Sequence, residues 1–187
     1  MVKETENPCH QIEKAREDLI QELSQNMHLY GISESVGRLY GTVLFANEPV
    51  TLDEMSQSLG MSKTSMSTGM RILSEANMVE KAWKKGVRKD LYQPVDDWYK
   101  SFSTTFVKRW KVSVVNNLQA VHQMRDTLLD IEQNQELNST EYTVVKADLH
   151  TLEQAEKYYN WLSEVTELFE SGQIFELIPK KITKSLE

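Results

Sequence analysis

Apolar residues recur at three- and four-residue steps along most of the chain, which is the pattern of amphipathic helices. The spacing predicts four helices in the first half of the chain, over residues 9–29, 33–46, 51–60 and 63–76. The third begins with a capping box, in which the Thr51 hydroxyl accepts from the backbone amide of Glu54 and the Glu54 carboxylate reaches back. Only the connection 60–62 separates it from the fourth, so these two helices form a tight helical turn.

After Asn77 the pattern changes to the alternation that is typical of strands. Two short strands, 78–83 and 90–95, flank the polar segment 84–89, which predicts a β-hairpin with a basic tip. The order of three helices, a tight turn, a fourth helix and a hairpin is that of a winged helix-turn-helix. We therefore expect a mainly α fold with one β-hairpin, in which 63–76 is the recognition helix.

A very long helix is predicted from Asp96-Asp97 to about Gln135, and another over 141–170. The tail over 174–186 is predicted to be a short helix interrupted at Pro179. Apolar residues repeat every seven positions along the long helix and form what we call the heptad seam. Its a positions are Val107, Val114, Val121 and Leu128, and its d positions are Trp110, Asn117, Met124 and Ile131. Such a seam favours pairing with a partner helix. At roughly 1.5 Å per residue the helix is too long to be buried in a monomer of this size.

These observations divide the chain into two predicted domains. Residues 1–95 would form a winged helix-turn-helix DNA-binding domain with an N-terminal helix, and 96–187 a helical dimerisation and effector region. We expect a homodimer that places two recognition helices about 34 Å apart, which suits a palindromic operator.

Composition sets further bounds. The 187 residues are 26% charged and 40% hydrophobic, as in an ordinary globular protein. No apolar run approaches the roughly 20 residues that cross a bilayer, and the acidic N-terminus lacks the apolar segment of a secretory signal. The single cysteine, Cys9, supports no internal disulfide framework. We therefore expect a cytoplasmic protein that does not engage membranes.

Charge is unevenly distributed along the chain. The net charge is −7, yet residues 60–90 contain seven lysines and arginines against three carboxylates, a net charge of +4. The rest of the chain therefore carries −11. A localised basic patch on an acidic body is typical of a protein that touches phosphates with one face. Chance clustering on a solvated surface is the alternative reading of charge alone.

The residues of this patch favour double-stranded DNA as the partner. The outer face of 62–71 holds short donors and cations without a carboxylate among them, which suits phosphates and major-groove base edges. These candidates are Ser62, Lys63, Thr64, Ser65, Ser67, Thr68 and Arg71. We expect Thr64, Ser65, Thr68 and Arg71 to face the groove. The wing candidates, directed at backbone phosphates or the minor groove, are Lys84, Lys85, Arg88 and Lys89, on a loop that Gly86 allows to turn tightly.

Two segments resemble a known family. The run Ser35-Val36-Gly37-Arg38-Leu39-Tyr40-Gly41 and the wing sequence from Trp83 to Tyr92 resemble the GbsR subgroup of the MarR-like winged-helix regulators, and the resemblance covers essentially the whole chain. It implies a repressor of choline-uptake and glycine-betaine-synthesis genes, active in osmotic stress, that responds to choline. It also implies an effector pocket where the reading domain meets the dimerisation helices.

Aromatic residues near that junction are candidates for binding a quaternary ammonium, whose charge rests against ring faces. Tyr99, Phe106 and Trp110 stand at the start of the long helix, and Tyr40 could form a facing wall. The alternative is that these rings are core. Ligand binding would shift the angle between the long helix and the reading domain, and so move the recognition helices out of register with the half-sites.

Nothing in the sequence favours an enzyme, a cofactor or a metal site. The four histidines are scattered, and there is no HExxH, no glycine-rich phosphate loop and no nucleophile elbow. Cys9-His10 is interpreted as incidental. Two alternatives to the choline-responsive repressor stay open: a MarR-like regulator that senses another small ligand, and a winged-helix module whose basic face binds an acidic protein.

Overall fold

The computed structural model describes residues 7–181. The chain divides into two compact units, Met1–Phe102 and Ser103–Glu187, and the division falls within one helix. The domain boundary expected after residue 95 lies just before that helix.

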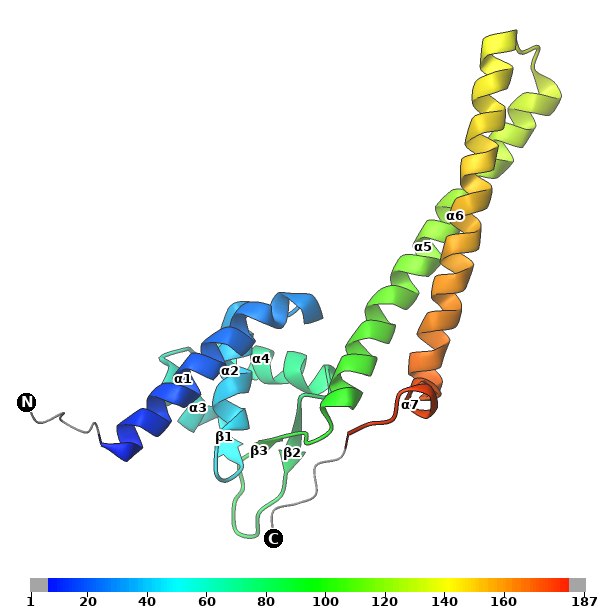
Figure 1. Ribbon diagram of the computed structural model, residues 1–187. Helices are drawn as coiled ribbons and strands as arrows, with labels where there is room; N and C mark the ends of the chain where they lie inside the picture. The colour runs from blue at the N-terminus through cyan, green and yellow to red at the C-terminus, as the bar shows by residue number, and fades with distance from the viewer. Residues whose placement is uncertain (1–6, 182–187) are drawn as a thin grey trace, which may run out of the picture. The chain divides into compact units, whose positions relative to one another are not determined.

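The first unit contains the predicted helices and hairpin (Figure 1). Its elements are α1 (Pro8–Asn26), η1 (Met27–Tyr30), α2 (Glu34–Leu44), β1 (Val50–Thr51), α3 (Leu52–Leu59), α4 (Lys63–Glu75), β2 (Val79–Ala82) and β3 (Leu91–Pro94). The first α-helix is shorter than predicted because its last turn tightens into the 3₁₀ turn η1, which ends at Gly31 with a φ of 70°.

Local interactions hold the turn between α3 and α4. The predicted capping box of α3 is present, with Thr51 accepting from the Glu54 amide and Glu54 accepting from the Thr51 amide. Gly60 ends the helix with a φ of 63°, a left-handed conformation that glycine adopts without a steric penalty. The Ser56 hydroxyl then donates to the carbonyl of Met61 at 2.6 Å, and Ser62 caps α4.

The wing is part of a three-stranded antiparallel sheet with the order β1-β3-β2. The hairpin β2–β3 was predicted, whereas β1 was not. Val50 and Thr51 are too few to show an alternating pattern, and they pair with Tyr92 and Leu91 of β3. This pairing attaches the start of α3 to the base of the wing.

The core of the first unit lies between α2, α4 and the sheet. Its fully buried side chains include Leu39 and Val43 of α2 and Met66, Met70 and Leu73 of α4. Helix α1 packs along α2, where Gly41 faces the side chain of Ile20. The segment Ser35–Gly41 therefore supplies small residues for the packing of α1 on α2. Because Met66, Met70 and Leu73 are buried, the polar face of α4 points away from the core.

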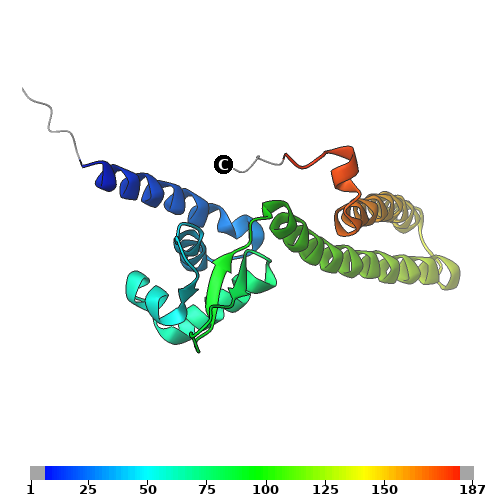
Figure 2. The same ribbon diagram turned by 90° about the horizontal axis from the view of Figure 1, so that it is seen from below.

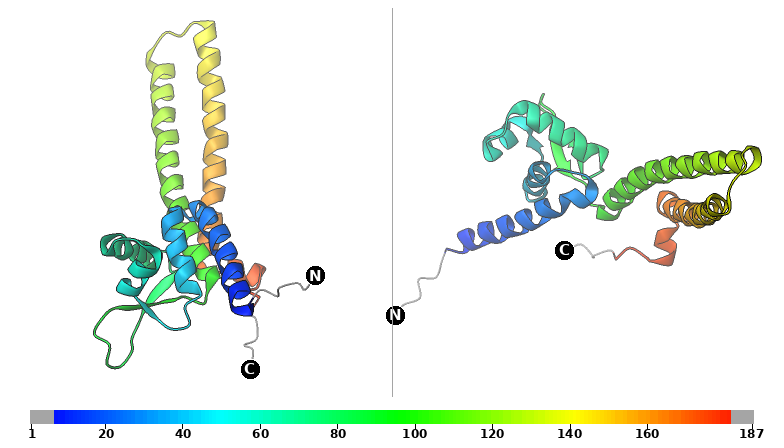
Figure 3. Two further views of the ribbon diagram at one scale, coloured as in Figure 1. Left: turned by 90° about the vertical axis from the view of Figure 1, so that its left-hand side faces the viewer. Right: turned by 90° about the horizontal axis from the view of Figure 1, so that it is seen from above.

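The second unit is an antiparallel helical hairpin. It comprises the rest of α5 (Trp98–Asn134), α6 (Ser139–Ser171) and α7 (Ile174–Leu177). The views in Figures 1, 2 and 3 agree that α5 and α6 run side by side. Helix α6 begins with a capping box of Asn138 and Glu141. The predicted tail helix ends at Leu177, and the part of the prediction beyond residue 181 lies outside the described residues.

Contacts along the hairpin fix its register. Phe106 packs against Phe169 with ring centroids 4.6 Å apart. Lys111 of α5 forms an ion pair with Glu170 of α6 at 2.5 Å. Farther along α5, Arg125 and His122 both contact the carboxylate of Glu156. Near the end of α5, Glu132 forms an ion pair with Lys146 at 2.5 Å. From Lys111 to Glu132 along α5, the ion-pair partners run back from Glu170 to Lys146 along α6.

This hairpin revises the interpretation of the heptad seam. Within the single chain Val114 and Val121 are only 4% and 8% exposed, and Val145, Leu152 and Leu162 of α6 are buried too. Part of the seam is therefore paired within the chain, since Val114 and Val121 are buried there, whereas the a positions Val107 and Leu128 are only half-buried. The d positions Trp110 and Met124 remain 37% and 44% exposed. A heptad pattern does not itself tell a partner in the same chain from one in another.

Among residues 7–181, none of the helices is both long and apolar enough to cross a membrane.

Candidate nucleic-acid interface

Helix α4 presents two chemically different faces. Met66, Gly69, Met70 and Leu73 are buried in the core. The side opposite the core holds all the predicted contact residues of the helix, and each of them is exposed. They are Ser62, Lys63, Thr64, Ser65, Ser67, Thr68 and Arg71. Because the apolar stripe fixes the rotation of the helix, the polar stripe is displayed as one continuous surface.

Hydrogen bonds order the beginning of this surface. The Ser62 side chain accepts from the backbone amide of Ser65 at 3.2 Å, and the two hydroxyls lie 3.0 Å apart. Ser62 is thereby engaged as the cap of α4. Farther along, Arg71 donates to Glu75 at 2.9 Å, one turn later on the same helix. Exposed pairs of this kind are weak, so the guanidinium can exchange its carboxylate for a phosphate or a base.

The wing loop between β2 and β3 is exposed throughout residues 83–90. Gly86 has a φ of 87°, which accounts for the tight turn predicted there. Lys85 and Arg88 are exposed and form no ion pair within the described part of the chain. Lys84 bonds to Glu48 at 2.5 Å, and this contact raises the pKa of the Lys84 ammonium.

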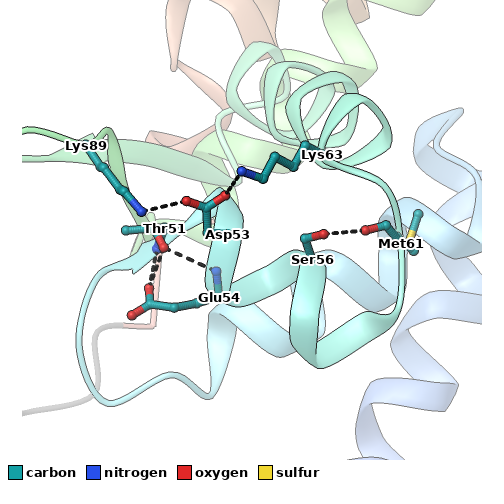
Figure 4. A network of polar contacts seen from close by, with 7 residues as sticks. All are labelled: Thr51, Asp53, Glu54, Ser56, Met61, Lys63 and Lys89. Atoms are coloured by element: carbon teal, nitrogen blue, oxygen red, sulfur yellow. Dashed lines mark hydrogen bonds and ion pairs between the residues drawn. The ribbon is translucent and has the colours of Figure 1, made fainter.

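Asp53 connects helix α4 to the wing (Figure 4). Its Oδ1 lies 2.6 Å from the Nζ of Lys63 at the start of α4, and its Oδ2 lies 2.6 Å from the Nζ of Lys89 on the wing. The hydrogen bonds from the two lysines lower the pKa of the Asp53 carboxyl to about 2. The carboxylate is therefore charged at neutral pH, and its charge is shared between two predicted DNA contacts.

Sequence reasoning missed three features of this surface. It assigned no partner to the wing lysines, although Lys84 and Lys89 each bond to a carboxylate 36 residues away. It assigned no role to Asp53. It also passed over Trp83, which is 83% exposed next to the wing lysines. The strand β1, which brings residues 48–53 to the base of the wing, is the link that the pattern did not reveal.

The four candidate ligand residues are divided between the two units. In the first unit Tyr40 is 5% exposed within the core cluster and Tyr99 is 39% exposed. Burial raises the pKa of the Tyr40 hydroxyl to about 12. In the second unit Phe106 and Trp110 form a tilted pair with centroids 6.1 Å apart, and Phe106 also packs on Phe169. The second pair of rings thus lies within an aromatic cluster of the hairpin.

Metal-binding groups are not gathered within the described residues. No three histidine, cysteine, aspartate or glutamate side chains of that part of the chain stand together as a metal site would need, and Cys9 is exposed.

Comparison with known proteins decides the family. Residues 98–176 match the model described as "GbsR family transcriptional regulator, C-terminal helical hairpin", which is the α5–α6 hairpin together with most of α7. The HTH-type transcriptional repressor GbsR of Bacillus subtilis (strain 168) is 37% identical over 168 residues, which cover 90% of this chain and 93% of that protein. The chain belongs to the GbsR family of transcriptional regulators.

Other GbsR-type relatives agree. The HTH-type transcriptional repressor OpcR of Bacillus subtilis (strain 168) is 38% identical over 90% of this chain and 91% of its own length. The putative HTH-type transcriptional regulator YvaV of that strain is 38% identical over 93% of this chain and 98% of its own. A crystal structure of a transcriptional regulator aligns with 84% of this chain and 99% of that chain, at 14% identity and a TM-score of 0.45, a likeness too distant to support a conclusion.

Family membership confirms three predictions. The resemblance read from SVGRLYG and the wing sequence is confirmed by relatives that align over nine-tenths of the chain. The observed elements are those of a winged helix-turn-helix followed by long helices. Like the members of this family, the chain is a DNA-binding transcriptional regulator, and it is not an enzyme.

Proposed function

We propose that this GbsR-family chain is a sequence-specific repressor that binds a palindromic operator as a homodimer. Helix α4 would enter the major groove, and the wing would contact the flanking phosphates. The observation that carries the proposal is the exposed face of residues 62–71, which holds seven donors and cations and no carboxylate. The sign of regulation is supported by GbsR and OpcR, both of which are described as repressors.

The DNA contacts are tested by selecting a preferred duplex from a random pool and measuring binding of two variants. Thr68→Ala and Arg71→Ala should each weaken binding to the selected duplex by about five- to 150-fold, the equivalent of about 1–3 kcal/mol per base contact. Ser74→Ala, in the last turn of α4 and outside the predicted contact set, is the matched control. Unchanged affinity in both variants would show that α4 is not the reading helix.

The same selection separates the proposal from its alternative. A winged-helix module that binds an acidic protein would also lose affinity in salt, because both contacts are ionic. It would not prefer one palindromic duplex over a random duplex. A preference of a hundredfold or more therefore supports the repressor, and equal binding of all duplexes supports the interaction module.

The homodimer is supported by apolar surface on the hairpin. Trp110 and Met124 of α5 are more than one-third exposed, and Tyr158 and Trp161 of α6 are 51% and 57% exposed. Aromatic residues of this kind are enriched at protein interfaces. Sedimentation at micromolar concentration should give about twice the 21.7 kDa of one chain. A monomer at that concentration would exclude the proposed dimer.

We further propose that the regulated genes serve choline uptake and glycine betaine synthesis, with choline as the effector. Support comes from the family resemblance and from the exposed rings of Tyr99 and Trp110, because aromatic faces bind quaternary ammonium groups. Choline, glycine betaine and ethanolamine should be titrated against tryptophan fluorescence. Saturable quenching by choline that is lost in Trp110→Ala supports the assignment. No response to any of the three favours a GbsR-type regulator with a different ligand.

A further inference from the structure

We infer that Asp53 is an internal competitor of the DNA backbone, which holds Lys63 and Lys89 in the free protein and so limits binding to non-operator DNA. The inference rests on the proposed DNA-binding function and adds a positioning residue to it. Asp53 would contact neither base nor phosphate and would act through the two lysines.

The geometry of the carboxylate is that of a bridge. Each oxygen of Asp53 serves one ammonium, at 2.6 Å in both cases, so that one negative charge meets two positive ones (Figure 4). The lysines come from different elements, since Lys63 is the first residue of α4 and Lys89 lies on the wing. The bridge therefore joins the two parts of the fold that would grip DNA on either side of a groove.

Local structure holds Asp53 in place. It is the second residue of α3, inside the capping box of Thr51 and Glu54. Thr51 also pairs with Leu91 of β3, which leads directly out of the wing. The backbone that carries the carboxylate is thus fixed both to the helix and to the sheet, so Asp53 reaches both lysines from a rigid position.

The contacts are open to exchange. The side chains of Lys63 and Lys89 are 74% and 65% exposed, and that of Asp53 is 32% exposed. Ion pairs at such exposure are weak and are screened by salt. A phosphate oxygen can replace the carboxylate, and the replacement leaves Asp53 near the DNA backbone as a repulsive charge. Both effects lower affinity for any duplex, whatever its sequence.

Replacing the carboxylate should therefore strengthen non-specific binding. Asp53→Asn raises the local charge by one and frees both lysines. With a slope of about −0.9 for each neutralised phosphate, the plot of log K against log salt should steepen by about one to two. Affinity for a 30-base-pair duplex of random sequence should rise about eightfold near 0.1 M salt for each additional phosphate neutralised, by the same relation.

Asp90→Asn is the matched control. It makes the same change of charge in the same unit, and it breaks one exposed pair, to Lys81 of β2 at 2.7 Å. Lys81 lies outside the predicted contact set, so this variant should change the slope by less than half as much. A second variant, Lys89→Gln, removes one arm of the bridge. In a protein that already carries Lys89→Gln, Asp53→Asn should steepen the slope about half as much as it does in the otherwise unchanged protein.

The possible outcomes distinguish failure of this inference from failure of the proposed DNA-binding function. If the unmodified protein binds no duplex, both the proposed function and the inference are overturned. If it binds duplex but Asp53→Asn equals Asp90→Asn in slope and affinity, DNA binding stands and the competitor role is overturned. Weaker binding by Asp53→Asn, with an unchanged circular-dichroism melting curve, would overturn it as well, because the bridge would then assist binding.

Discussion

Gly37 of α2 lies so close to Ser24 of α1 that a Cβ atom at residue 37 would stand 2.8 Å from the α-carbon of Ser24. The same atom would meet Cγ of Met27 at 2.7 Å, and both Ser24 and Met27 are buried. Backbone that is packed on backbone cannot yield as a side-chain tip can. We therefore expect Gly37→Ala to lower the free energy of unfolding by about 1–3 kcal/mol, despite the better helix propensity of alanine. Urea denaturation measures the change.

Gly69 supplies the control for this prediction. A Cβ there would meet only Cδ2 of Leu39 closely, at 2.8 Å, and that atom is the end of a flexible side chain. Helix propensity favours alanine by up to about 1 kcal/mol and offsets the crowding, so Gly69→Ala should change stability little. Equal losses in the two variants would show that the contact between α1 and α2 is not what requires glycine at position 37.

Burial of Tyr40 makes stability depend on alkaline pH. The pKa of its hydroxyl is about 12 in the folded protein and 10.0 in its unperturbed state. The unfolded chain therefore releases this proton first, and stability falls as the pH rises from about 10 to about 12. Tyr40→Phe should make that fall shallower in urea titrations across this range. Tyr158→Phe, at an exposed ring, should leave it as in the unmodified protein, and identical curves for all three proteins would contradict the prediction.

The hairpin predicts a different response at two valines of α5. Val121 is 8% exposed and Val115 is 63% exposed. Val121→Ala should lower the free energy of unfolding by about 2 kcal/mol, from lost burial and a residual cavity. Val115→Ala should stay within about 0.5 kcal/mol. Because Val121 is buried within its own chain, Val121→Ala should lower the free energy of unfolding by the same amount at two protein concentrations that differ tenfold. A loss that grows on dilution would place the partner in a second chain.

Trp83 should report contact of the wing with DNA. It is 83% exposed and adjoins Lys84, whereas Trp161 of the hairpin is 57% exposed and lies in the other unit. If the wing meets the backbone, duplex DNA changes the surroundings of the Trp83 indole. We expect most of the fluorescence change on adding DNA to disappear in Trp83→Phe and to persist in Trp161→Phe. A full change in Trp83→Phe would contradict contact by the wing.

The parts of the fold that were predicted are those that short-range chemistry decides. The capping box of Thr51 and Glu54, the left-handed Gly60 and the Ser62 cap define the turn between α3 and α4 without help from distant residues. The wing follows from alternation around a glycine turn at residue 86. Local signals therefore sufficed for the winged helix-turn-helix and for the polar face of α4.

The parts that were missed depend on distant pairing. Two residues of β1 carry no period, and they form a strand only because β3 pairs with them. A heptad of valines shows that a helix face is buried but leaves open whether the partner is α6 or another chain. The bridging role of Asp53 depends on Lys89, which is 36 residues away, so no local sequence motif predicts it.

The antiparallel register of α5 and α6 constrains how this hairpin can change length. Lys111 faces Glu170 near its base and Glu132 faces Lys146 near its tip, so the two arms are matched turn by turn. Residues deleted from one arm alone would leave apolar side chains of the other arm facing water and would separate every ion pair beyond the deletion. Tolerated insertions and deletions should therefore occur in both arms at once and by whole heptads, whereas single-residue changes belong in the connection between Asn134 and Ser139.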